Sequence, residues 1–297
     1  MSRSTRSLPP LPQTLVDAAI RVALDEDLGL AGDITTNATV AANATANAVI
    51  AARKPGVVAG LALAEAAFRA IAPETDFTIE TGDGETVKPG AVIARISGNA
   101  RALLTAERVA LNFLGRLSGI ATLTRQYVDK VAGTHAKIVD TRKTTPGLRA
   151  FEKYAVRCGG GYNHRVGLFD AVLIKDNHIV AAGGIASAIK AAKTAAGHMT
   201  KIEVEVDTLA QLEIVMREKV DCVLLDNMTP AKLVQAVAIV GGRCLTEASG
   251  GVNLETVTEI AQTGVDLISV GALTHSASVL DLGLDFIASP KQATIQA

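Results

Sequence analysis

The second half of this chain alternates short apolar runs with segments of helical periodicity, and this pattern restricts the possible folds more than any other feature. The runs favour strands and recur at spacings of about 20 to 33 residues, as βα units do. They span residues 136–140, 171–174, 202–206, 222–225, 244–247 and 267–270. Segments with apolar residues at helical spacing lie between the later runs, at 208–219, 230–240 and 254–263. The alternation predicts a parallel sheet with helical crossovers.

Polar or glycine residues stand at the end of each apolar run. They are Thr141, Arg142 and Lys143; Lys175, Asp176 and Asn177; Glu205 and Asp207; Asp226 and Asn227; Glu247, Ser249, Gly250 and Gly251; and Gly271. The carboxyl ends of parallel strands share one face of a barrel, whereas an open doubly wound sheet gathers its ligand contacts at one crevice. Consecutive polar ends on all six runs favour a barrel. A dinucleotide glycine fingerprint and a Walker A loop are absent from the sequence, which disfavours Rossmann and P-loop folds.

The N-terminal part has a different pattern, which predicts helices beside antiparallel strands. Residues 14–28 and 61–72 have helical periodicity, 46–52 is a strand-like run, and 77–96 is divided into short strands by glycine and proline turns. Residues 103–131 form a long amphipathic stretch without proline. This stretch predicts either one helix or a pair of helices broken near Ser118 and Gly119.

Composition restricts the class of partner. A chain of 297 residues that is 48% hydrophobic can bury the core of one or two domains. Only 3% of the residues are aromatic and the net charge is -1, which disfavours nucleic acid as a partner. No segment has the length and apolar character of a membrane span or a secretory signal. The three cysteines form no CxxC pair and indicate a reducing compartment.

Basic residues are concentrated between Asp140 and Lys175. The cations in this segment are Arg142, Lys143, Arg149, Lys153, Arg157, Arg165 and Lys175, with His164 beside them and only Asp140, Glu152 and Asp170 as acids. A focused positive field suits a small ligand with several negative charges, because arginine and lysine match carboxylate and phosphate oxygens. The Gly159–Gly161 turn before Asn163 is either an anion cradle or only a flexible loop. Arg149, Lys153 and Arg157 recur four residues apart, for which we favour a solvated helix face.

Lys175 and two acids at strand ends leave alternatives open. Lys175 ends an apolar run and must reach solvent, Asp176 or an anionic ligand, of which we favour the ligand. Glu205 and Asp226 supply oxygen ligands that suit Mg²⁺ together with ligand phosphates, but they could equally be structural partners of Lys175 and Lys143. The isolated His135, His198 and His275 are expected at the surface or satisfied in the core.

Segments along nearly the whole chain resemble the quinolinate phosphoribosyltransferase family, also called the carboxylating nicotinate-nucleotide pyrophosphorylases. The segments are GDITT at Gly32–Thr36, part of ARKPGVVAGL within 51–61, LLTAERVALNFLGRLSGIAT at Leu103–Thr122, TRKTTPGLR, NHR, IKDNH, EVEVD, LLDNM and EASGGV. TRKTTPGLR and the NHR and IKDNH pair are far more specific than a lone glycine motif.

The resemblance implies a reaction of NAD biosynthesis. The phosphoribosyl group of 5-phosphoribosyl 1-diphosphate would pass to the ring nitrogen of quinolinate, with loss of diphosphate and of the 2-carboxylate as CO₂, to give nicotinate mononucleotide. The implied α/β fold is an N-terminal α/β sandwich domain and a C-terminal open TIM-like α/β barrel. We expect these domains at 1–118 and 119–276, with the tail 277–297 joined to the first. A cytoplasmic homodimer that shares each active site across its interface is also implied.

The resemblance also implies roles for residues. Arg142, His164, Arg165 and Lys175 would hold the dicarboxylate, and Arg108 would enter from the neighbouring subunit. The catalytic residues would be Lys143, Glu205 and Asp226, which would face the phosphoribosyl diphosphate and its Mg²⁺. Ser249, Gly250 and Gly271 would hold the 5-phosphate.

Two other functions remain alternatives. One is a relative with the same barrel and another acceptor, such as nicotinate or a substrate linked to molybdenum uptake, against which Arg142 and Arg165 argue because they match two carboxylates. The other is a phosphate-binding or sensor barrel without catalysis. A complete set of acids and bases at the strand ends argues against this second alternative.

Overall fold

The computed structural model describes residues 8–287, and the chain divides into two compact units. The first unit contains the residues up to Thr122, Arg157–Gly159 and the segment from Ala277; the second contains Leu123–Val156 and Gly160–Ser276. The first residues of the N-terminal arm, 1–7, and the end of the C-terminal tail, 288–297, lie outside the described residues. The domain limits expected at 118 and 276 stay a prediction.

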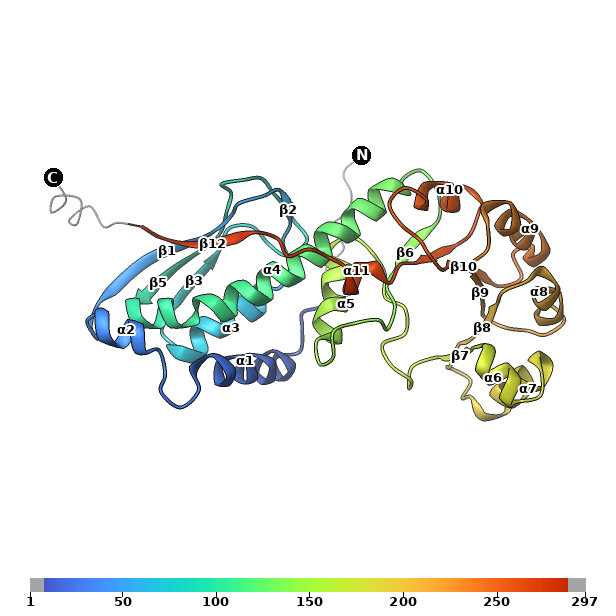
Figure 1. Ribbon diagram of the computed structural model, residues 1–297, viewed down its shortest axis with the longest axis horizontal. Helices are drawn as coiled ribbons and strands as arrows, with labels where there is room; N and C mark the ends of the chain where they lie inside the picture. Colours follow the sequence, from blue (N-terminus) through green and yellow to red (C-terminus); the bar gives the residue numbers. More distant parts are fainter. Residues whose placement is uncertain (1–7, 288–297) are drawn as a thin grey trace. The chain divides into compact units, whose positions relative to one another are not determined.

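The first unit is built on an antiparallel sheet (Figure 1). Its strand order is β12 (Leu282–Ile287), β1 (Thr45–Ala52), β5 (Val92–Asn99) and β3 (Asp76–Ile79). The short strands β2 (Gly56–Val57) and β4 (Thr86–Val87) form a separate ribbon. Three helices, α1 (Gln13–Leu28), α2 (Ile34–Thr39) and α3 (Leu61–Ile71), belong to the same unit. The expected helices beside antiparallel strands are therefore confirmed.

The core of the first unit follows from the period of its apolar residues. Val16, Ile20 and Leu24 recur every four residues and form the buried stripe of α1. The fully buried Leu63 and Phe68 of α3 lie in the same core as isoleucines of β1 and β5. Burial of each such side chain contributes roughly 1.5–3 kcal/mol.

The long helix α4 (Ala100–Lys130) is unbroken, which settles the alternative that the sequence left open. The Ser118 hydroxyl accepts a hydrogen bond from the Ala59 N–H at 3.0 Å and so faces a packed neighbour. A Cβ atom at Gly119 would lie 2.0 Å from the carbonyl oxygen of Ser278. The small residues therefore allow two other chain segments to approach the helix closely, and they do not mark a break.

The second unit contains a sheet of six parallel strands. In sequence they are β6 (Lys137–Val139), β7 (Val172–Ile174), β8 (Ile202–Val206), β9 (Cys222–Asp226), β10 (Leu245–Ser249) and β11 (Leu267–Ser269). Their order in space is β6-β11-β10-β9-β8-β7. All six strands were expected from the sequence at these positions, and the ends differ from the expected ones by no more than two residues.

The strand order is that of a barrel with one open seam. Consecutive strands pair from β7 to β11, and β11 returns to pair with β6, the first strand of the unit. In the described part of the chain no ladder joins β6 to β7. The expected open barrel is confirmed, because a doubly wound sheet would reverse its strand order near the middle.

Helices connect the strands of the second unit. They are α5 (Arg149–Cys158), α6 (Asp176–Ala181), α7 (Ile185–Ala195), α8 (Leu209–Val215), α9 (Pro230–Val240), α10 (Val257–Gln262) and α11 (Ala272–His275). Figure 1 shows α8 and α9 on the outside of the strands that they connect. Within residues 8–287, no helix is both long enough and apolar enough to cross a membrane.

The residues after α5 lie along the edge of β6 that β11 does not occupy. Tyr162 donates its N–H to the Ile138 carbonyl at 2.9 Å and accepts the Asp140 N–H at 3.2 Å. The carbonyl oxygen of Val139, the residue between, instead accepts a hydrogen bond from the Val270 N–H at 3.0 Å. A single bridge at Tyr162 thus stands at the seam where a further ladder would close the barrel.

Candidate active site

The parallel strands bring ten of the expected site residues to one edge of the barrel. Arg142 and Lys143 follow β6, Lys175 follows β7, Glu205 lies in β8, Asp226 ends β9, Ser249 ends β10, Gly250 follows it, and Gly271 follows β11. His164 and Arg165 lie just beyond the Tyr162 bridge beside β6. The carboxyl ends of parallel strands point to the same face, which is where barrel enzymes hold their substrates.

The ends of β9 and β10 are joined by Asn227. Ser249 lies opposite Asp226 in the ladder, and its carbonyl accepts the Asn227 N–H at 2.9 Å. A Cβ atom at Gly250, where φ is +93°, would lie 2.1 Å from the Asn227 side-chain oxygen. The Asn227 amide in turn donates to the Asp226 carboxylate at 2.6 Å. Glycine at 250 is therefore required, and the asparagine fixes the Asp226 carboxylate.

Lys143 and Gly271 lie together because β6 and β11 are paired. The Lys143 carbonyl accepts a hydrogen bond from the Thr274 hydroxyl at 2.7 Å. A Cβ atom at Gly271 would lie 3.2 Å from Cδ of Lys143, so the lysine stem passes close over the glycine backbone. The Lys143 side chain is exposed at this edge of the barrel.

Lys175 forms an ion pair with Glu205. Its ammonium donates to Glu205 Oε2, and the two side chains are 43% and 14% exposed. The alternative in which Glu205 is a structural partner of Lys175 is thus realised in this structure. The pair remains at the exposed edge of the barrel, where Lys175 can also reach a ligand.

His164 is held inside the barrel by its own chain. Its Nε2 lies 2.9 Å from Glu203 Oε2 and 3.7 Å from Glu247 Oε2, while its Nδ1 accepts the Arg165 N–H at 2.8 Å. In this contact Nδ1 acts as the acceptor, so Nε2 is the ring nitrogen that donates to Glu203. Burial acts to lower the pKa of His164, but the two acids outweigh this effect and raise the pKa.

Glu203 and Glu247 are buried acids for which the sequence predicted no role, although Glu247 was among the polar residues at strand ends. Each has one side-chain oxygen, Oε1, that is buried and finds no hydrogen-bond partner in the part of the chain that the structure describes. Burial raises the pKa of Glu247 to about 8, and the charge of Glu203 acts in the same direction. Glu247 therefore carries its proton at neutral pH. Strand periodicity was the available signal for Glu203, because the EVEV segment places it on the same face as Glu205.

The His164, Glu203 and Glu247 donor atoms lie within 4.8 Å of one another, as the ligands of a metal ion do. Coordination through Nε2 would move the ring proton to Nδ1, where the Arg165 N–H already points. This hydrogen bond disfavours a metal at the cluster. The remaining histidines expected outside any cluster, His135, His198 and His275, are exposed, which confirms that expectation.

The expected solvated face of α5 is wrong for Lys153, which is only 3% exposed. Its ammonium donates to Asp140, whose side chain is 0% exposed, and to the His164 carbonyl at 3.0 Å. A buried carboxylate needs a partner of opposite charge, and that need overrides helix periodicity. Burial raises the pKa of Asp140 and lowers that of Lys153.

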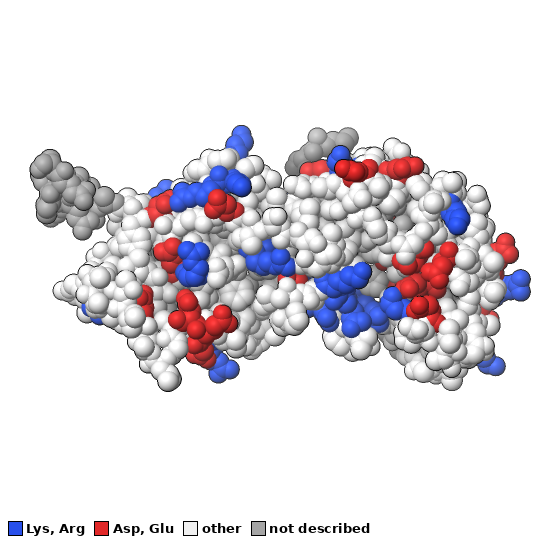
Figure 2. All heavy atoms as spheres, in the orientation of Figure 1, with Lys and Arg blue, Asp and Glu red and all other residues white. Residues whose placement is uncertain are grey.

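Arg142 and Arg165 form the cationic centre of the edge. Burial lowers the pKa of Arg165, and the charge of Arg142 lowers it further. The two guanidinium groups are therefore close enough to repel each other electrostatically. The Nε of Arg142 is buried and has no hydrogen-bond partner among the described residues. Figure 2 shows a compact group of basic side chains over the segment between α5 and β7. Two adjacent cations with free donor capacity suit a ligand with two carboxylates.

Arg108 is the expected site residue that the barrel does not contain. It lies on α4 in the first unit and is 65% exposed, and its ion-pair contact within residues 8–287 is a distant one, with Glu107 at 3.9 Å.

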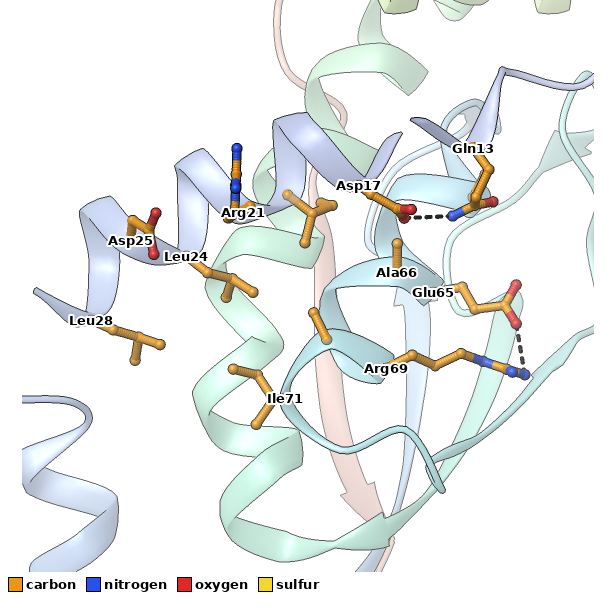
Figure 3. Close-up of a pocket in the computed structure, with 13 residues that line it drawn as sticks. Gln13, Asp17, Arg21, Leu24, Asp25, Leu28, Glu65, Ala66, Arg69 and Ile71 are labelled. Atoms are coloured by element: carbon orange, nitrogen blue, oxygen red, sulfur yellow. Dashed lines mark hydrogen bonds and ion pairs between the residues drawn. The ribbon is translucent and has the colours of Figure 1, made fainter. Parts of the chain in front are cut away.

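A groove of about 770 Å³ lies in the first unit between α1 and α3 (Figure 3). Its polar side chains largely pair with one another, as in the Glu65–Arg69 ion pair at 2.8 Å and the Gln13–Asp17 hydrogen bond at 2.7 Å. None of the expected site residues lines this groove.

Comparison with known proteins covers almost the whole chain. The family model for the quinolinate phosphoribosyl transferase C-terminal domain matches residues 120–285, and the model for the N-terminal domain matches 33–118. The nicotinate-nucleotide pyrophosphorylase (carboxylating) of Mycobacterium leprae is 46% identical over 271 residues, which are 90% of this chain and 95% of that protein. The chloroplastic enzyme of the same name from Arabidopsis thaliana is 43% identical, over 93% of this chain and 84% of that protein.

A solved structure is also similar to this chain along its length. The nicotinate-nucleotide pyrophosphorylase from Francisella tularensis is 40% identical, with a TM-score of 0.90, and the match covers 96% of this chain and 100% of that one.

Proposed function

The chain belongs to the quinolinate phosphoribosyltransferase family, and from this premise we propose that it transfers phosphoribosyl from 5-phosphoribosyl 1-diphosphate to quinolinate. The products are nicotinate mononucleotide, diphosphate and CO₂. The enzyme is then a carboxylating nicotinate-nucleotide diphosphorylase, a pentosyltransferase of NAD biosynthesis.

The observation that carries this proposal is the pair Arg142 and Arg165 at one edge of the barrel. Two neighbouring guanidinium groups match the two carboxylates of quinolinate, and the unpartnered Nε of Arg142 has a donor to offer. Nicotinate has a single carboxylate and would leave one of these cations without a partner. We assign Lys175 and His164 to the same subsite. His164 contributes through its hydrogen bond to the Arg165 backbone, since both of its ring nitrogens are engaged within the protein.

The phosphoribosyl group is assigned to the other strand ends. Ser249, Gly250 and Gly271 lie at β10 and β11, where backbone N–H groups can hold the 5-phosphate. Lys143 passes over Gly271 and can reach the diphosphate. With these assignments the anionic groups of both substrates would lie on one face, so that the ring nitrogen could approach the ribose carbon.

Glu205 and Asp226 would hold Mg²⁺ together with diphosphate oxygens. Their oxygen donors suit this ion, and both side chains are only partly buried at the ends of adjacent strands. A bound Mg²⁺ would neutralise charge on the departing diphosphate. We assign Lys143, Glu205 and Asp226 as the catalytic residues around the ribosyl centre, which becomes cation-like as diphosphate leaves.

Decarboxylation follows from the chemistry of the ring once the new bond to nitrogen has formed. The electron pair of the broken carbon–carboxylate bond stays on the ring carbon, and the quaternised nitrogen beside it stabilises that charge. A proton then takes the place of CO₂. The chain's contribution to this step is to orient the ring and to exclude water around it.

A homodimer that shares its active site is the proposed assembly. Arg108 is exposed on α4, and its ion pair among the described residues, with Glu107, is a distant one, so its charge is available for a ligand held by a second copy of the chain. A cytoplasmic location stays a prediction, which fractionation of cells with an antibody to the protein would check.

The decisive experiment gives the purified protein Mg²⁺, 5-phosphoribosyl 1-diphosphate and quinolinate labelled in its 2-carboxylate, with nicotinate in a parallel reaction. We expect labelled CO₂ and nicotinate mononucleotide from quinolinate and no product from nicotinate. Product from nicotinate alone would identify a sister activity. A folded protein without turnover on either acceptor would contradict the proposal and favour a binding protein.

A further inference from the structure

Three residues of α5 together hold the two segments that carry the arginines of the proposed dicarboxylate subsite, and one of the three contacts both segments. We propose that Arg149, Glu152 and Lys153, here called the α5 clamp, hold Arg142 and Arg165 in their binding arrangement before any ligand arrives. They are positioning residues, and Arg149 has the largest share because it contacts both segments. This inference rests on the proposed function, since it assigns the clamp to quinolinate binding.

The first segment, residues 141–145, is fixed by two members of the clamp. Arg149 Nε donates to the Thr144 hydroxyl at 3.0 Å, and its NH2 reaches the Arg142 carbonyl at 3.5 Å. The buried Glu152 accepts both the N–H of Thr145, at 3.1 Å, and its hydroxyl, at 2.8 Å. The turn that directs Arg142 and Lys143 is thereby bonded to the first turn of α5.

The second segment, residues 163–166, is fixed by the other contacts of the same helix. Lys153 Nζ donates to the His164 carbonyl at 3.0 Å, and the Lys153 carbonyl accepts from the Asn163 amide at 2.8 Å. Arg149 NH1 donates to the Val166 carbonyl at 3.1 Å. Arg165 therefore stands between two residues whose carbonyls are bonded to α5.

Asp140 joins the two sets of contacts. Its carboxylate accepts from Lys153, from the Asn163 amide at 2.7 Å and from the His164 N–H at 2.8 Å. Asp140 directly precedes the first segment, so the same buried group anchors both segments to one lysine.

The open seam of the barrel explains why side chains, and not a strand ladder, have to hold the two segments in place. Residues 163–166 follow the single Tyr162 bridge, and no ladder in the described residues holds them beside β7. Arg142 and Arg165 carry like charges that repel each other when no dicarboxylate lies between them. Donors from α5 to three backbone carbonyls can hold the segments against that repulsion. A subsite that is organised in advance loses less conformational entropy on binding.

The test compares Arg149→Met with wild type and with Arg243→Met. Arg243 is a matched control because it also donates to three backbone carbonyls, those of Val240, Met216 and Ile239, in the same unit and away from both segments. Steady-state kinetics with quinolinate and with phosphoribosyl diphosphate are measured for each protein. Hydrogen–deuterium exchange of ligand-free protein reports the amides of 141–145 and 163–166.

We expect Arg149→Met to raise the KM for quinolinate by about tenfold, with a much smaller change in kcat and in the KM for the diphosphate. Exchange should rise in both segments, Arg149→Lys should recover part of the affinity, and Arg243→Met should leave both readouts unchanged. A folded Arg149→Met with wild-type KM for quinolinate would overturn the inference, as would exchange that rises equally in Arg243→Met.

A second variant keeps the test independent of one residue. Lys153→Met leaves a buried charge on Asp140, so it is combined with Asp140→Asn, which removes that charge and retains an acceptor oxygen. This double variant should also raise the KM for quinolinate, and an unchanged KM would count against the clamp. Wild-type protein is assayed in parallel to distinguish failure of the clamp proposal from failure of the proposed function. Absence of quinolinate turnover in wild type would contradict the proposed function itself.

Discussion

Two groups of buried ionisable side chains lie close together in the barrel, and they are built differently. Around Asp140, one carboxylate meets one ammonium, and its hydrogen bonds come from Lys153, Asn163 and the His164 backbone. Around His164, two acids meet one imidazole, and each acid has an oxygen that finds no hydrogen-bond partner within residues 8–287. The first group is balanced in charge, and its hydrogen bonds hold residues 163 and 164 beside Asp140. The second group has an excess of acid and is relieved by a proton on Glu247.

The largest effect is expected when the ion pair between Asp140 and Lys153 in the balanced group is broken. Lys153→Met leaves the Asp140 carboxylate buried without its cation, and we expect the free energy of unfolding to fall by about 3–5 kcal/mol. Urea unfolding followed by circular dichroism measures this loss. The double variant with Asp140→Asn should regain most of it, and a single variant as stable as wild type would show that the ion pair is not required.

The next effect concerns the two acids on one face of β8, the buried Glu203 and the more exposed Glu205. We expect only the second of them to contact Mg²⁺ and diphosphate. Glu205→Ala should lower kcat by at least about 100-fold, because it removes a proposed ligand of Mg²⁺ and diphosphate. Its stability should change little, since Lys175 is 43% exposed and can be hydrated. Asp207→Ala, at the exposed acid two residues later, is the control. Full activity of Glu205→Ala would remove Glu205 from the catalytic residues.

A smaller effect is expected in the pH dependence of stability, which Glu247 in the acid-rich group should control. Because the pKa of Glu247 is raised from 4.5 to about 8, the folded chain binds this proton more tightly than the unfolded chain. The stability from this group is fully present below pH 4.5 and is lost as the pH rises towards 8. Glu247→Gln keeps a neutral group of the same shape, so its stability relative to wild type should rise by about 2 kcal/mol from about pH 6 to pH 8.

Thermal unfolding of both proteins across this pH range checks the Glu247 prediction. Glu218→Gln, at the partly exposed ion pair with Lys193, is the matched control for loss of a carboxylate. A stability difference that stays flat with pH would mean that Glu247 is ionised in the folded protein.

The smallest expected effect is a partial recovery of activity in mixed dimers, which tests whether the site includes a residue outside the barrel. Neither Arg108→Ala nor Lys175→Ala subunits should be active alone, whereas an equal mixture should recover about a quarter of wild-type activity, because half of the dimers then contain one intact site. Activity is measured after subunit exchange, which native mass spectrometry of labelled subunits confirms. No recovery despite exchange would contradict a site shared through Arg108.

The sequence predicted the barrel well because strand and helix periods are local properties. All six strands of the second unit, and α9 at both of its ends, lie where apolar spacing placed them. Polar residues at strand ends were predictable for the same reason, since a parallel sheet brings those ends together whatever its side chains are. Arg142, Lys175, Glu205 and Asp226 were found by this rule.

The misassigned or overlooked residues depend on contacts between distant parts of the chain. Lys153 reads as a surface residue until Asp140, 13 residues earlier, is placed beside it inside the barrel. Glu203 was overlooked because it lies within a strand, and its partner His164 is 39 residues away. Gly119 suggested a break in α4 because the approach of Ser278 cannot be read from the residues near it.

The pairing of the last strands sets an order for the chain as it leaves the ribosome. β6 is the first strand of its sheet to be made, yet its ladder partner β11, which pairs Leu267 with Lys137, is made about 130 residues later. β1 likewise acquires its outer neighbour from β12, with Asn47 opposite Ile287. Both sheets therefore stay incomplete during most of synthesis, and the nascent chain exposes two unpaired strand edges until its C-terminal segment emerges.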